Sequence, residues 1–200
     1  MTPPSVHRQT ALACLIGGGF GLDFVLPNAG APLARAAAEV LRVGSVALFA
    51  ALLLSIALNW RRSRRARRSP GASAGRGRNL FGAGYWLVVV AEVALIAGGR
   101  AAVAALHGPQ QLDVAWTALV VGLHFVAFAA FGVWGGAVRT LGLTLATLGA
   151  TGVALSLTPA VVWVPLTSGV TSGFALLVGS LHWNLRDLAK GQPHRGYGHA

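Results

Sequence analysis

Residues 61–68 read Arg-Arg-Ser-Arg-Arg-Ala-Arg-Arg and lie between two long apolar segments, residues 33–59 and 80–99. Hydrocarbon cannot solvate so many guanidinium groups, so this block must lie in water or against lipid headgroups. Each apolar segment is long enough to cross a bilayer, whose core needs about 20 helical residues. The block therefore marks a loop, residues 60–79, between two membrane spans. Its arginines are Arg61, Arg62, Arg64, Arg65, Arg67 and Arg68.

The composition indicates a membrane protein. Hydrophobic residues make up 54% of the 200 residues and charged residues only 10%, whereas soluble domains carry about 25% charged residues. The formal charge of +11 comes mostly from eight arginines between residues 61 and 78. A nucleic-acid-binding protein would spread such residues over a folded surface, so we expect anionic lipid headgroups as the partner. The excess of arginine over lysine, with abundant Ala and Gly, favours a bacterial origin.

Six apolar segments are long enough to span a bilayer as helices, because a backbone in lipid must satisfy its own hydrogen bonds. The predicted fold is an all-α transmembrane bundle of one domain, residues 1–200. Placing loop 60–79 in the cytoplasm puts both termini there, with 13 of the 16 Lys and Arg residues on that side, as the positive-inside rule requires. The predicted spans are residues 9–26, 33–59, 80–99, 112–135, 138–157 and 159–183, followed by a polar tail, residues 184–200.

The N-terminal segment has an alternative interpretation as a cleaved signal peptide. Its weakly basic start, apolar run and Ala29-Gly30-Ala31 resemble such a signal. Three glycines and Asp23 within the apolar run disfavour cleavage. Cleavage would leave five spans in the same orientation.

Glu92 and His124 form the main candidate site. Glu92 lies 12 residues into the third span from Leu80, and His124 lies 11 residues before the end of the fourth span at Gly135. Both side chains are therefore expected near the middle of the bilayer, on helices that a short loop places side by side. A lone carboxylate there is costly, so we expect a Glu92–His124 pair. It would serve either proton handling and substrate binding or helix packing alone.

A second polar group lies nearer the opposite end of the first two spans. It contains Asp23 of the first span and Arg35, Glu39 and Arg42 of the second. The three residues of the second span share a helix face by their i,i+4 and i,i+3 spacing. We favour an interfacial start of this helix, with arginines reaching the headgroups, over a buried site.

Threonines and serines suggest a polar seam between the fifth and sixth spans. Four threonines of the fifth span recur at spacings of 4, 3 and 4, which places them on one helix face. Pro165 is expected to kink the sixth span. The alternative is ordinary packing by small hydroxyl residues. The residues concerned are Thr140, Thr144, Thr147 and Thr151, and in the sixth span Thr167 and Thr171 with Ser168 and Ser172.

Three GxxxG pairs could seat a neighbouring helix or a second copy of the chain in a homo-oligomer. They are Gly17/Gly21, Gly132/Gly136 and Gly169/Gly173.

The sequence carries no recognisable catalytic motif. It lacks a HExxH zinc motif, a nucleotide-binding loop and a GxSxG elbow, and its single cysteine, Cys14, cannot form an internal disulfide. We therefore expect no catalytic residue, metal or cofactor. The segments Tyr85-Trp86-Leu87-Val88-Val89-Val90-Ala91-Glu92 and Ala118-Leu119-Val120-Val121-Gly122-Leu123-His124-Phe125 resemble small multi-span bacterial membrane proteins. This resemblance implies that Glu92 and His124 belong to a shared pattern, and it implies no activity. The function expected is a permease-like or proton-handling protein, or else a non-catalytic accessory subunit.

Overall fold

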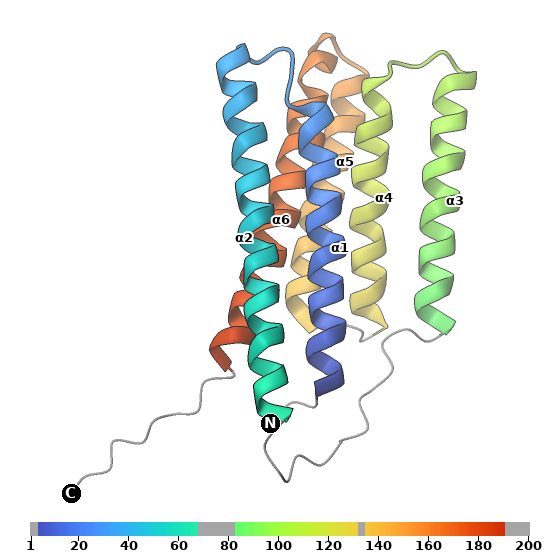
Figure 1. The fold of residues 1–200 in the computed structure, drawn as a ribbon. Coiled ribbons are helices and arrows are strands. Elements are labelled where there is room, and N and C mark those ends of the chain that lie inside the picture. The colour runs from blue at the N-terminus through green and yellow to red at the C-terminus, as the bar shows by residue number, and fades with distance from the viewer. Residues whose placement is uncertain (1–3, 68–82, 132–134, 191–200) are drawn as a thin grey trace, which may run out of the picture.

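The chain folds into a bundle of long helices that run side by side (Figure 1). The computed structural model describes residues 4–67, 83–131 and 135–190, with the side chains at 4–8, 63–67, 83, 135, 187 and 190 excepted. Six helices in these ranges are long and apolar enough to cross a membrane, which confirms an all-helical, multi-pass fold. The helices are α1 Pro4–Asn28, α2 Arg35–Arg67, α3 Ala83–Ala105, α4 Gln111–Ala130, α5 Gly135–Ser156 and α6 Thr171–Lys190.

The second and sixth spans continue as helices beyond their predicted ends. α2 runs through most of the arginine block to Arg67, so the expected loop 60–79 was wrong in its first part. Arginine and alanine are strong helix formers, and a helix can continue into water once its apolar part ends. The 33 residues of α2 extend about 50 Å at 1.5 Å per residue, well beyond a bilayer core. α6 likewise continues to Lys190, into the predicted tail.

The sixth span is broken, as Pro165 predicted. A 3₁₀-helix, Pro159–Trp163, leads into a π-helix, Pro165–Val170, which precedes α6. Proline has no N–H to donate, so regular α-helical hydrogen bonding cannot pass through this position. The π-helix contacts α1, α4 and α5 and therefore lies where the two parts of the bundle meet.

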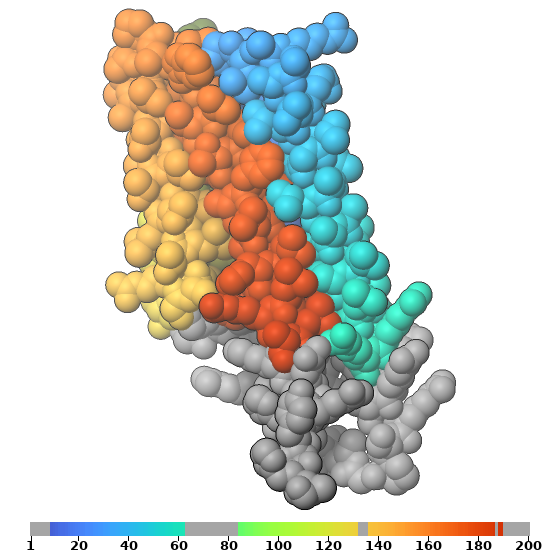
Figure 2. All heavy atoms as spheres, turned by 90° about the vertical axis from the view of Figure 1, so that its left-hand side faces the viewer, coloured from blue at the N-terminus to red at the C-terminus, as the bar shows by residue number. Residues whose placement is uncertain are grey.

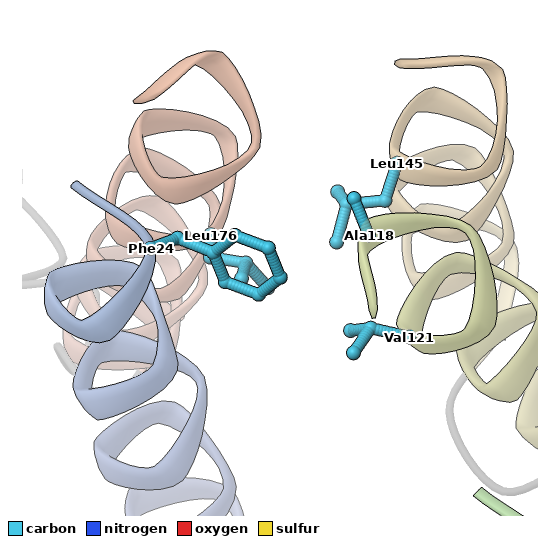
Figure 3. Packing of buried hydrophobic residues seen from close by; sticks show 5 residues of the cluster. All are labelled: Phe24, Ala118, Val121, Leu145 and Leu176. Atoms are coloured by element: carbon cyan, nitrogen blue, oxygen red, sulfur yellow. The ribbon is translucent and has the colours of Figure 1, made fainter. Parts of the chain in front are cut away.

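The helices form two groups. α1, α2 and α6 pack on one another, and α4 packs most extensively against α5. Figure 2 shows α2 and α6 side by side along most of their lengths. A buried apolar cluster joins the groups: Phe24 and Leu176 project from α1 and α6 toward Ala118, Val121 and Leu145 on α4 and α5 (Figure 3).

Glycines allow α1 and α6 to approach closely. A Cβ at Gly21 would lie 2.8 Å from the Gly173 carbonyl oxygen, and one at Gly17 would lie 2.7 Å from Ser180 Oγ. Two of the three predicted GxxxG pairs, Gly17/Gly21 and Gly169/Gly173, therefore supply glycines to contacts within this chain. In the third pair, a Cβ at Gly136 would have no atom within 4 Å, and Gly132 lies outside the described residues.

α3 is the peripheral helix of the bundle. It packs substantially against α4 alone, and Figure 1 shows it at the edge. No described residue of α3 is buried, whereas the other five helices each bury several. Whatever holds α3 in place must therefore come from its contacts with α4.

Candidate functional site

The hairpin of α3 and α4 brings Glu92 and His124 to the same level. Glu92 lies 13 residues before the end of α3 at Ala105, and His124 lies 13 residues after the start of α4 at Gln111. Both are therefore about 20 Å along their helices from the connecting loop. Toward the other end they are nearer the helix termini than expected, because α4 ends at Ala130 rather than at Gly135.

The two side chains are in direct contact. His124 Nδ1 and Glu92 Oε2 are 2.7 Å apart, and the side chains are only 10% and 13% exposed, respectively. Nδ1 nevertheless makes no aligned hydrogen bond to this or any other described group. The contact is thus a close electrostatic pair whose hydrogen bond needs a small reorientation. An imidazole and a carboxyl group at this distance can share or exchange a proton.

Aromatic rings surround the imidazole. The centroid of the His124 ring lies 4.1 Å from that of Phe128, with 71° between the planes, and 5.5 Å from that of Phe125, with 81° between the planes. Tyr85 of α3 in turn stacks on Phe128, with 5.1 Å between centroids and 7° between planes. The sequence did not single out these rings. The spacing of Phe128 from His124, i,i+4, and of Tyr85 from Glu92, i,i+7, could have indicated them.

Two further contacts hold α3 on α4 beyond the pair. Trp116 Nε1 donates a hydrogen bond of 2.8 Å to the Leu95 carbonyl oxygen. The indole reaches this carbonyl because Gly99 has no side chain, and a Cβ there would overlap the ring. Near the loop, Arg100 Nε lies 3.8 Å from Asp113 Oδ2 in a half-exposed ion pair. Polar and aromatic contacts thus run along much of the α3–α4 interface.

The second polar group lies on the surface. Glu39 and Arg42 form an exposed ion pair, with 2.9 Å between Oε1 and Nη1. Arg35 is exposed, and Asp23 is exposed with no ion-pair partner among the described residues. The four residues do not come together as one buried site. This placement agrees with an interfacial start of α2.

The threonines do not form the predicted seam between the fifth and sixth spans. The four threonines of α5 do share a face, but that face is exposed, as is Thr171. The buried face of α5 carries Leu145 and Gly152, each one residue after a threonine and so about 100° around the helix. Thr140, Thr144, Thr167 and Thr171 donate hydrogen bonds to carbonyls of their own span.

A serine makes the contact that was expected of the threonines. Ser168 Oγ, in the π-helix, donates a hydrogen bond of 2.8 Å to the Leu148 carbonyl of α5. Ser172 is fully buried, and its hydroxyl has no hydrogen-bond partner in the described part of the chain.

An asparagine network joins α2 and α6 and was missed from the sequence. Asn184 is 1% exposed, donates to Ser55 Oγ at 2.6 Å and accepts from Asn59 Nδ2 at 3.0 Å. No charge or motif marks these residues, so only the pairing of the two helices reveals them. The network locks the register of α2 against α6.

The arginine block lies at the end of α2. Arg61 and Arg62 are exposed, and Arg64, Arg65 and Arg67 belong to the helix, with side chains outside the described set. Arg68 lies outside the described residues.

Within the described residues, no three His, Cys, Asp or Glu side chains are grouped so as to hold a metal ion. Comparisons with protein-family models, curated proteins and solved structures gave no match to this chain.

Proposed function

We propose that this multi-pass membrane protein is a small permease-like protein that handles protons at the Glu92–His124 pair. The observation that carries the proposal is the 2.7 Å contact between two titratable groups within helices of membrane-spanning length. Ionisable residues inside a membrane are costly and typically mark proton or substrate pathways.

The chemistry of the pair suits a proton inside hydrocarbon. The proton can lie on the Glu92 carboxyl group, facing a neutral imidazole, or on His124, facing a carboxylate. The net charge of the pair is zero in both states, so moving the proton between them leaves no isolated charge to be solvated. A second proton, taken from one side of the membrane, would make the pair positive and favour release toward the other side.

The proposed location is the bacterial cytoplasmic membrane, with both termini in the cytoplasm. The ends of the helices support a common side for the basic segments: Arg67, Ala83 and Lys190 lie at one end of the bundle, and Asn28 and Ala105 at the other (Figure 1). Exposed Arg61 and Arg62 would then meet anionic headgroups at the inner surface.

The peripheral position of α3 favours a second candidate function, a non-catalytic accessory subunit. None of the described residues of α3 is buried, and its outer face is apolar, with Leu87 67% and Val90 63% exposed. Such a helix could dock on a larger membrane protein, and the Glu92–His124 pair would then only hold α3 on α4.

Proton flux into liposomes distinguishes the two candidates. The purified protein is reconstituted in liposomes that contain a pH-sensitive dye, and a proton gradient is applied. We expect flux in the natural protein and a fall to background in Glu92→Gln, which keeps the shape of the side chain but cannot ionise. Glu39→Gln is the matched control, because Glu39 is exposed and remote from the pair.

The fold of each variant is checked by circular dichroism and gel filtration. Equal flux in Glu92→Gln and in the natural protein would contradict proton handling. Flux indistinguishable from empty liposomes in the natural protein would favour the accessory role.

A further inference from the structure

The carboxylate of Glu92 does not by itself fix the orientation of the His124 ring. The Nδ1–Oε2 distance of 2.7 Å is short enough for a hydrogen bond, but the bond is not aligned. Proton exchange between the two atoms requires that Nδ1 face the carboxylate. Another contact must therefore keep the imidazole from turning away.

Phe128 is placed to make that contact. It is 2% exposed, and its centroid lies 4.1 Å from that of the imidazole, closer than the 5.5 Å of Phe125. Both rings meet His124 edge-on, an arrangement that aromatic pairs prefer. Since His124 and Phe128 are four residues apart on α4, this contact is maintained by the helix itself.

Tyr85 extends the arrangement to α3. Its ring lies parallel to that of Phe128, with 5.1 Å between centroids and 7° between planes. Tyr85 and Glu92 are seven residues apart and so lie on the same face of α3. α3 therefore provides both the carboxylate and the ring that backs Phe128, so the two members of the pair are oriented by the same interface.

We propose that Phe128, backed by Tyr85, is the positioning residue of the Glu92–His124 pair. It holds the imidazole with Nδ1 toward Oε2, and it touches neither the carboxylate nor any transported species. The value of this role for proton movement rests on the proposed function, whereas the orientation itself can be tested without it.

Solid-state nuclear magnetic resonance of the full chain in lipid bilayers tests the orientation. The protein carries ¹⁵N-histidine and ¹³C-glutamate, and His124→Gln identifies the His124 signals. We expect a cross-peak between His124 Nδ1 and the Glu92 carboxyl carbon in the natural protein. Phe128→Leu should lose this cross-peak and show a second ring environment. Phe128→Tyr, which restores an aromatic ring, should retain it.

Phe131→Leu is the matched control, since Phe131 is 61% exposed and lies three residues further along the chain. It should keep the cross-peak. Tyr85→Leu leaves the buried Phe128 in place and should weaken the cross-peak, whereas Tyr85→Phe should preserve it. These Tyr85 variants decide the question if Phe128→Leu does not fold.

A full cross-peak in a folded Phe128→Leu protein would overturn the positioning role. So would a full cross-peak in Tyr85→Leu where Phe128→Leu fails to fold. Failure of the proposed function looks different, because the cross-peak would then depend on Phe128 while the natural protein carried no protons in liposomes.

Discussion

The contacts of α1 with α6 and of α3 with α4 show two ways of joining helices in this bundle. α1 and α6 meet through glycines, with Gly21 and Gly173 letting the two backbones approach. α3 meets α4 through side chains, among them the Glu92–His124 pair and the Trp116 indole. Backbone contact between glycines depends on one fixed distance, whereas side-chain contacts can rearrange or change protonation. The interface that can change is the one that holds the ionisable pair.

The largest effect is expected from closing the gap between α1 and α6. In Gly21→Ala, the new Cβ would lie 2.8 Å from the Gly173 carbonyl oxygen and 2.7 Å from Leu177 Cγ, so the helices must move apart. We expect the free energy of unfolding to fall by about 1–3 kcal/mol, the usual range for overpacking. Chemical unfolding in detergent micelles measures it.

Gly19→Ala is the matched control on the same helix, because nothing lies within 4 Å of a Cβ there. Its stability should stay within about 0.5 kcal/mol of the natural protein. Equal losses in the two variants would mean that backbone approach does not hold α1 on α6.

A smaller effect is expected from Trp116→Phe, which removes the hydrogen bond to the Leu95 carbonyl and keeps an aromatic ring. Interhelical hydrogen bonds in membranes contribute about 0.6 kcal/mol on average. Local opening of α3 should therefore become about threefold more frequent. Hydrogen exchange of α3 amides measures this, with α5 amides as the internal reference. A change confined to α5 would contradict the assignment.

The smallest effect is expected from Arg100→Gln. The Arg100–Asp113 pair is 3.8 Å long, and the arginine side chain is 63% exposed. Such pairs contribute between about 0 and 1 kcal/mol and are weakened by salt. We expect α3 exchange to rise less than in Trp116→Phe, and the difference from the natural protein to vanish at high salt. A larger rise than in Trp116→Phe would place the main attachment of α3 at its loop end.

Sequence reasoning predicted the central pair but not its surroundings. Glu92 and His124 could be matched because both were counted along helices that a short loop joins. Their mutual contact depended only on that count and on the cost of a lone charge in lipid. Phe128 and Tyr85 are ordinary aromatic residues in apolar segments, and nothing in their chemistry separates them from the other rings until the two helices are paired.

The threonines of α5 show the limit of helix periodicity in a membrane protein. Their spacing placed them correctly on one face, but that face is exposed. In water, the polar face of a helix is the outer one. In a bilayer, both the lipid-facing and the buried faces can be apolar, so polarity does not say which face meets a neighbour. In α5 the contact face is instead marked by small residues, among them Gly142 and Gly149.

The sequence by itself determined that six helices can cross a membrane, because apolar runs of about 20 residues in lipid must bond their own backbones. It also determined the common level of Glu92 and His124, through their equal distances from the loop. Only the tertiary structure decided which glycines face one another, that α3 stays at the edge of the bundle, and which rings orient His124. These features depend on how each helix is rotated toward its neighbours, which packing between helices sets and apolar sequence leaves open.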